Sequence, residues 1–284
     1  MISVVIPALN EEARIAKCLQ VLKAQTKQPR EIIVVDGGST DKTVSIAESF
    51  DVQVLQNPKR HAAAARNIGI QAAKGEIIAF TDADCIPAAD WVEQIERAFL
   101  DSQLEGLGGK VTAAPPENDV EAFWSKLALE IIMSFGDEGY TVQAQTLNDA
   151  FITANAAYSA DLLHRIGGFD EWFANNAEDV DLAWRALRTG AVLRYVPAVC
   201  VLAHGVTTLK DIRRKSYRNG VSSSKLQKRY GRFFNCDLRI YALLGKNLVA
   251  MLRRKPQASW MVMELMWHLL GKYHGSLKAG VVNV

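Results

Sequence analysis

The first 80 residues alternate short β-branched runs with helical patterns, and this alternation strongly restricts the folds open to the chain. Strands are predicted at 2–6, 31–35, 52–55 and 76–80, and helices at 12–24, 41–50 and 62–73. Strands that alternate with helices of about 10–15 residues are typical of a parallel sheet with helices on both faces. We therefore predict an α/β fold with a mostly parallel central sheet flanked by helices.

Polar side chains follow three of the predicted strands. They come after the first, second and fourth strands: Asn10 with Glu11, Asp36, and Asp82 with Asp84. In open α/β sheets, ligands bind beyond the carboxyl ends of the strands. We therefore expect these side chains to share one rim of the sheet and to form a binding site there.

The segment Asp82-Ala83-Asp84 is a candidate metal site. Two carboxylates two residues apart face one site only where the chain bends, as it does when a strand runs into a loop. Such a pair suits Mg²⁺ or Mn²⁺, and the cation would neutralise a leaving diphosphate. The alternative is two solvated loop aspartates, which the position at the end of a strand disfavours.

Two further polar residues of this half have open alternatives. Asp36 precedes two glycines, so its carboxylate suits a nucleobase N–H or a ribose hydroxyl, or else an Asx turn. Arg66 lies on a predicted helix with an alanine-rich face. It would reach a diphosphate, orient the acidic loop, or serve as a surface or structural arginine.

The second half of the body contributes two more candidates. Glu178 and Asp179 begin a predicted helix, where one carboxylate would act as general base or would only complement the helix dipole. His204 follows an apolar strand at 199–203, and its neutral imidazole would complete a metal site or play a structural role.

The order and spacing of six segments resemble glycosyltransferase family 2, the inverting enzymes with the GT-A fold. The segments are Val4–Glu12, Val34–Asp41, Ala65–Gly69, Ala79–Asp84, Gly167–Glu171 and Glu178–Leu182. The resemblance covers residues 1–205. It implies transfer of a sugar from a nucleotide-diphosphate sugar, such as a UDP- or GDP-sugar, to a hydroxyl acceptor.

The resemblance also implies roles for individual residues. The nucleotide and donor would be contacted by Pro7, Ala8, Asn10, Glu11, Asp36, Arg66, Asp82 and Ala83. Mn²⁺ or Mg²⁺ would be held by Asp84, with His204, and Asp179 would be the base. The region of the donor sugar and acceptor would include Asn155, Gly168, Phe169, Asp170 and Glu178. A loop closing over the diphosphate would carry Arg213, Arg214 and Arg218.

The sequence departs from the usual family pattern in two places. Gly37 stands where an acidic residue is usual, so contacts to the base or ribose are expected to differ. The Gln/Arg-x-x-Arg-Trp motif of processive members is absent, and the nearest segment is Arg213–Arg218. We therefore predict transfer of a single sugar.

Charge divides the chain into two parts. Residues 1–205 carry 17 Lys+Arg and 28 Asp+Glu, a net charge of −11, whereas residues 206–284 carry 16 and 3, a net charge of +13. We predict a GT-A catalytic domain at 1–205 and a basic, amphipathic, helical C-terminal extension at 206–284. The extension has three segments, at 209–232, 240–255 and 260–272.

Basic amphipathic helices bordered by Trp favour an anionic membrane surface, and a lipid or lipid-linked glycan would then be the acceptor. Alternatively the apolar faces pack on the body or on a second protomer, which leaves a homodimer open. No motif for nucleic acid accompanies the charge.

The chain shows no pattern of a secreted or membrane-spanning protein. A strand is predicted from Ile2 onward, the four cysteines form no CxxC pair, and no run of about 20 apolar residues occurs. We predict a cytoplasmic enzyme, peripheral on the inner face of the cell membrane, that acts in envelope polysaccharide or glycolipid synthesis.

Two other functions are open to an α/β chain of this kind. A sugar-phosphate nucleotidyltransferase would carry a basic, Gly-rich loop after the first strand, where this chain has the acidic Ala8–Glu12. A non-catalytic membrane scaffold would not be expected to keep Asp82, Asp84 and Asp179.

Overall fold

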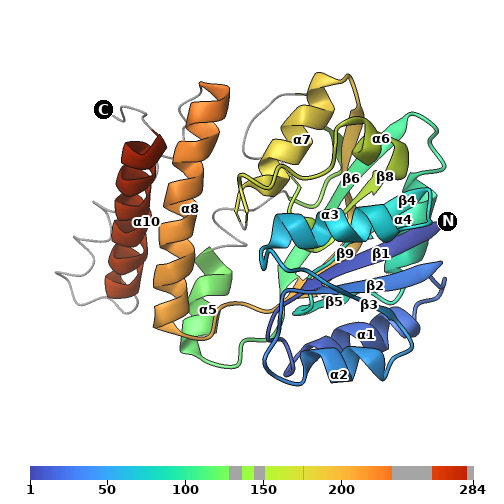
Figure 1. The fold of residues 1–284 in the computed structure, drawn as a ribbon, viewed down its shortest axis with the longest axis horizontal. Coiled ribbons are helices and arrows are strands. Elements are labelled where there is room, and N and C mark those ends of the chain that lie inside the picture. The colour runs from blue at the N-terminus through green and yellow to red at the C-terminus, as the bar shows by residue number, and fades with distance from the viewer. Residues whose placement is uncertain (128–135, 144–150, 175, 232–257, 280–284) are drawn as a thin grey trace. The chain divides into compact units, whose positions relative to one another are not determined.

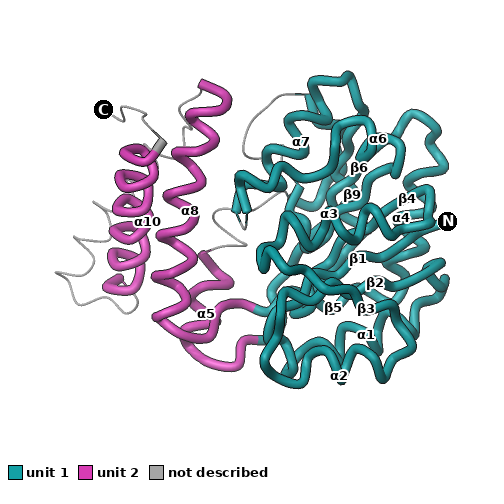
Figure 2. Tube along the Cα trace, in the orientation of Figure 1, with its two compact units in different colours: residues 1–115, 129–204 teal, residues 116–128, 205–284 magenta. Residues whose placement is uncertain are grey.

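The computed structural model describes residues 1–127, 136–143, 151–174, 176–231 and 258–279 (Figure 1). Its contacts divide the chain into two compact units (Figure 2). Unit 1 comprises residues 1–115 and 129–204, and unit 2 comprises residues 116–128 and 205–284. Each unit has a hydrophobic core of its own.

The strands of the described residues all belong to unit 1. They are β1 (Ile2–Ala8), β2 (Glu31–Asp36), β3 (Gln53–Gln56), β4 (Ile77–Phe80), β5 (Cys85–Pro87), β6 (Leu104–Ala113), β7 (Tyr140–Thr141), β8 (Ala156–Ser159) and β9 (Val192–Ala203). The helices of unit 1 are α1 (Ile15–Lys23), α2 (Thr43–Glu48), α3 (Ala62–Ala72), α4 (Trp91–Ala98), α6 (Ala160–Arg165) and α7 (Glu178–Arg188), with a 3₁₀ turn at Thr153–Asn155. The strands and helices predicted for residues 1–80 are all present.

The strands form one sheet in the order β3-β2-β1-β4-β8-β6-β9-β5, with β7 paired to β9. β3, β2, β1 and β4 are parallel, as predicted. The other half is mixed, because β8 runs antiparallel to β4 and β6, and β5 and β7 run antiparallel to β9. The antiparallel pairing places Ala156, at the start of β8, opposite Phe80 at the end of β4, beside the acidic loop.

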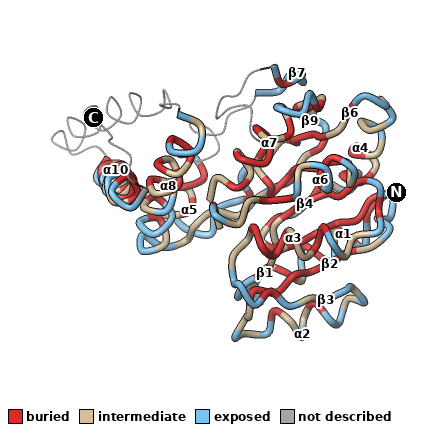
Figure 3. The backbone as a smooth tube through the Cα atoms, turned by 45° about the horizontal axis from the view of Figure 1, so that its top comes forward, coloured by how far each residue is buried: buried red, intermediate tan, exposed pale blue. Residues whose placement is uncertain are grey.

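Both faces of the sheet are covered by helices. On one face Val4 and Ile6 of β1 join a core that includes α1 and α4, and on the other Val5 joins a core that includes α3, α6 and α7 (Figure 1). The strands β1 and β4 are accordingly buried along nearly their whole length (Figure 3). A sheet buried on both sides explains why these strands read as continuous apolar runs.

Unit 2 contains α5 (Asp119–Ser125), α8 (Leu209–Tyr230) and α10 (Ala258–Ala279). The backbones of α8 and α10 approach closely, because a Cβ on Gly271 would lie 2.0 Å from the carbonyl oxygen of Tyr217. Phe123 and Trp124 of α5 share a core with Ile212 of α8. None of the helices among the described residues is long and apolar enough to cross a membrane.

The structure places segment 116–128 with unit 2, which the predicted boundary after residue 205 did not anticipate. Helix α5 ends at Ser125, and residues 128–135 lie outside the described residues. The predicted apolar segment 240–255 also lies outside them.

Gly69 allows α3 to lie directly against β1. An added Cβ would lie 2.2 Å from Cγ1 of Val5, a side chain that is stiff at χ1. Alanine gains about 1 kcal/mol of helix propensity over glycine, but overpacking a core costs about 1–3 kcal/mol. We expect Gly69→Ala to lower the free energy of unfolding in urea.

The double variant Gly69→Ala/Val5→Ala should recover part of this loss, because it removes the atoms that clash. Gly37→Ala is the control, since its Cβ would meet nothing closer than 3.5 Å. Equal stability of Gly69→Ala and wild type would show that α3 does not need this close approach.

Candidate active site

The loops after β1 and β2 are tied together by hydrogen bonds. The backbone N–H of Asn10, a residue with φ 56°, donates to Oγ of Ser39 (2.9 Å), and Oδ1 of Asn10 accepts from the N–H of Thr40 (2.9 Å). The N–H of Glu11 donates to Oγ1 of Thr43 (2.7 Å). The two predicted polar clusters therefore form one rim.

Asp36 is buried, and its carboxylate accepts the N–H groups of Gly38 (2.9 Å) and Ser39 (3.1 Å). This is the Asx-type turn that was one of the two interpretations. β1 and β2 pair up to this point, with Pro7 opposite Val35 and Ala8 opposite Asp36. The carboxylate has further lone pairs, which suit a hydrogen-bond donor group of a ligand.

Sequence reasoning missed Arg60, which lies over the turn after Asp36. Its Nε donates to the carbonyl of Gly37 (3.1 Å) and its Nη2 to the carbonyl of Gly38 (2.9 Å). The turn thus carries a guanidinium near the position where the family usually has an acid. No local pattern indicates this contact, because Arg60 follows β3 and is 22 residues from Gly38.

The acidic loop after β4 is anchored at both aspartates. Oδ1 of Asp82 accepts from Nη2 of Arg66 (2.9 Å), and Ala83 between the aspartates is buried. The carbonyl of Asp84 accepts the N–H of His204 (3.3 Å), where β5 pairs with β9. The backbone therefore brings His204, predicted from an isolated position, to the predicted metal ligand Asp84.

Carboxylates at this rim repel one another. Burial, followed by the charge of Asp84, raises the pKa of Glu11 to about 7, and Asp82 and Asp41 add smaller contributions in the same direction. The charge of Asp84, which contributes to this raised pKa, would also favour a cation bound beside Glu11.

The first turn of α7 forms the other side of the cluster. Ala177, with φ 67°, precedes the helix, and buried Glu178 accepts from Nη1 of Arg66 (2.8 Å). Burial, together with the charge of Asp179, raises the pKa of Glu178 to about 7. Burial also raises the pKa of Asp179, which lies at the first turn as predicted.

The Gly168-Phe169 turn is held from two helices. Asn67 of α3 accepts the N–H of Phe169 (2.8 Å) and donates to its carbonyl (2.9 Å). Arg185 of α7 donates to the carbonyl of Gly168 (2.7 Å). Asp170 closes its own turn by accepting the N–H of Trp172 (2.9 Å). Asn67 and Arg185 were missed, although both lie within or beside the motifs.

Asn155, predicted to border the donor sugar and acceptor, is buried, and its side chain forms hydrogen bonds with groups of the protein core. Its Oδ1 accepts from Nε1 of Trp91 (2.8 Å), and its Nδ2 donates to the carbonyls of Lys110 (2.8 Å) and Val199 (2.9 Å). A substrate contact by this side chain would require these bonds to break.

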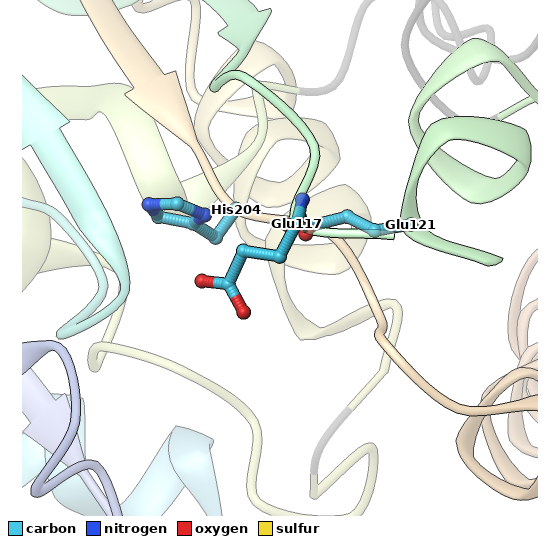
Figure 4. A group of neighbouring side chains, drawn as sticks. All are labelled: Glu117, Glu121 and His204. Atoms are coloured by element: carbon cyan, nitrogen blue, oxygen red, sulfur yellow. Dashed lines mark hydrogen bonds between the residues drawn. The ribbon is translucent and has the colours of Figure 1, made fainter. Parts of the chain in front are cut away.

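Figure 4 shows the side chains of Glu117, Glu121 and His204, of which the glutamates belong to unit 2 and His204 ends unit 1. Within unit 2, the carboxylate of buried Glu121 accepts the N–H groups of Glu117 (2.8 Å) and Gly205 (2.8 Å). Glu121 therefore fixes the backbone directly after His204.

The three arginines predicted in a diphosphate loop belong to unit 2. Arg213, Arg214 and Arg218 lie on α8, and all three are exposed. The segment is therefore helical and not a loop. Thr208 caps the start of this helix, since its Oγ1 accepts the N–H of Asp211 (3.1 Å). Contact of these arginines with a diphosphate stays a prediction.

The profile described as Glycosyl transferase family 2 matches residues 3–167, more than half of the chain. The pre-mycofactocin glycosyltransferase of Mycobacterium tuberculosis is 30% identical over 225 residues, which are 77% of this chain and 46% of that protein. The chain thus spans about half the length of this relative. It belongs to glycosyl transferase family 2.

Two further proteins extend the comparison. The glycosyltransferase AglE of Haloferax volcanii is 29% identical over 77% of this chain and 71% of its own length. The solved mannosyltransferase PcManGT of Pyrobaculum calidifontis, in complex with GDP-Man and Mn²⁺, has a TM-score of 0.60 at 19% identity, and the match covers 100% of this chain and 76% of that one. The likeness confirms the predicted GT-A fold.

Asn155→Ala should destabilise the protein, because three partners lose their hydrogen bonds, two of them in the buried residues Trp91 and Val199. Each unsatisfied buried group costs about 1–3 kcal/mol, so we expect a loss of several kcal/mol in urea unfolding. Gln53→Ala on exposed β3 is the control, with a change within about 0.5 kcal/mol. Similar midpoints for both variants would contradict a structural role for Asn155.

Proposed function

We propose that this chain is an inverting glycosyltransferase that moves a single sugar from a UDP- or GDP-sugar to an acceptor hydroxyl. One observation supports this most directly. Arg66 binds both Asp82 of the acidic loop (2.9 Å) and Glu178 at the start of α7 (2.8 Å). The segments to which the family resemblance gives donor and acceptor roles are thereby joined in one site within unit 1.

The residues at the rim fit a divalent cation. Asp84 supplies a carboxylate beside Glu11, whose pKa is raised partly by that charge, and His204 adjoins Asp84 through the backbone. Asp84 and His204 would hold Mn²⁺ or Mg²⁺, hard or borderline cations that accept such ligands. A bound cation would neutralise the diphosphate as it leaves.

The protein's own groups would perform the remaining steps. Asp36 and the rim at Asn10 and Glu11 would hold the nucleotide, with Asp82 contacting it. Asp179 would accept the proton of the acceptor hydroxyl as the oxygen attacks the sugar carbon from the face opposite the diphosphate, which inverts that centre. The raised pKa of Asp179 suits this role, because a base is most effective when its pKa lies nearer the working pH.

Two substitutions separate these roles. Asp179→Asn should reduce release of nucleoside diphosphate from the donor by about 10²-fold or more, yet keep the rise in melting temperature on adding nucleotide with Mn²⁺. Asp84→Asn should abolish the part of that rise that depends on Mn²⁺. The donors to screen are UDP- and GDP-sugars.

Asp161→Asn is the matched control, since Asp161 also lies in the first turn of a helix, α6, and is exposed. It should leave turnover unchanged. If Asp179→Asn turned over donor at the wild-type rate, Asp179 would only complement the helix dipole.

We also propose that unit 2 binds an anionic membrane surface, which would place the enzyme on the cytoplasmic face beside a lipid or lipid-linked acceptor. The net charge of +13 over residues 206–284 complements anionic lipid headgroups. Helix α10 exposes an apolar stripe on one side, at Met266, Leu270, Tyr273 and Leu277, which are 50–65% exposed. A basic helix pair with such a stripe is typical of interfacial binding.

Replacing all four stripe residues with serine should strongly reduce sedimentation with anionic vesicles at low salt. The reason is that both apolar burial and charge contribute to interfacial binding. Leu100→Ser, at an exposed position in unit 1 (79%), is the control and should sediment like wild type. Wild-type protein that stayed in the supernatant would contradict the proposal, and a homodimer that shields the stripe would then be sought by light scattering.

A further inference from the structure

Arg66 is surrounded by more negative charge than it neutralises. Its guanidinium, 4% exposed, donates to Asp82 and Glu178 and is also stabilised by the charge of Asp179. Three carboxylates therefore share one cation. A buried arginine that bonds to acids on two separate segments holds those segments together, and its charge also favours the ionised form of the acids.

The setting of Arg66 fixes the direction of its guanidinium. The guanidinium carbon lies 5.7 Å from the centre of the Phe169 ring, and Phe169 is itself held by neighbouring Asn67. Nη1 and Nη2 point to different segments, and Nε has no hydrogen-bond partner among the described residues. Only a planar fork makes both contacts from one position, so lysine is not an equivalent residue here.

The groups that face Asp179 come from four elements. Glu178 of α7 and Asp82 after β4 disfavour its charge, Arg66 of α3 favours it, and the buried hydroxyl of Tyr158 on β8 interacts with it. The charge of Asp179 is favoured first by the N–H of Val180, which donates to Oδ1 (2.8 Å), then by the charge of Arg66, and then by the backbone of Asp179 itself.

We propose that Arg66 is a positioning residue that clamps the Asp82 loop to the first turn of α7 and brings its positive charge to the turn that carries Asp179, the proposed base. The part concerning catalysis rests on the proposed function. In place of the donor contact that the family resemblance implies for Arg66, this role needs no contact with donor or acceptor, because Arg66 acts through the acids that it holds.

Titration of the Asp179 carboxyl carbon by ¹³C NMR tests the electrostatic part without any turnover, with the signal assigned by Asp179→Asn. Arg66→Met removes the cation, so the pKa of Asp179 should rise by about 1–3 units. Arg66→Lys keeps the charge and should leave that pKa near the wild-type value. Glu178→Gln removes a like charge and should lower it. If Arg66→Met does not fold, turnover in Arg66→Lys decides the question.

Donor turnover against pH tests the positional part. Turnover should fall about 10-fold or more in Arg66→Lys, because one ammonium cannot hold both carboxylates, while the acidic limb of its profile stays in place. In Arg66→Met the limb should move to higher pH, and in Glu178→Gln to lower pH. A merely structural arginine would reduce turnover without moving the limb.

The two proposals fail in different ways. A wild type that releases no nucleoside diphosphate from any donor contradicts the proposed function, whereas the NMR titration still tests Arg66. An Asp179 pKa that is the same in wild type, Arg66→Met and Glu178→Gln would overturn the role of Arg66, as would full turnover in Arg66→Lys.

Discussion

The buried guanidinium of Arg66 is the interaction on which the candidate site depends. Asp82 and Glu178 are 96 residues apart in sequence, and each is bonded to the same side chain of α3. Removing one partner of a buried ion pair leaves an uncompensated charge, which costs several kcal/mol. The acidic loop and the start of α7 are therefore held in one arrangement before any ligand binds.

The sheet explains why α3 can make this link. Gly69 brings α3 against β1, and residues 66 and 67 then lie over the end of the sheet at which the acidic loop leaves β4. Within one turn of helix, Arg66 binds the acids and Asn67 binds the backbone of Phe169. Core packing and site geometry are thus set by the same few residues of α3.

Much of this could be predicted from sequence. The alternation of strands and helices is a local signal, so the elements of residues 1–80 and the polar ends of their strands were correct. The antiparallel β8 was not predicted, because strand direction depends on pairing across a long connection and not on the pattern within four residues. The contacts group segment 116–128 with residues 205–284, and the sequence could not indicate this, since an amphipathic helix does not show which core its apolar face joins.

The same difference between local signals and long-range contacts applies to the side chains of the candidate site. Asp84 is predicted as a metal ligand from its place after a strand, but its neighbour His204 is brought there by the pairing of β5 with β9, at a separation of 120 residues. Asn155 shows the converse, because a polar residue that the family resemblance places near the donor sugar and acceptor satisfies the backbone of β6 and β9. A motif therefore fixes which segments gather at a site, whereas hydrogen bonds between distant segments decide which of their side chains remain available for chemistry.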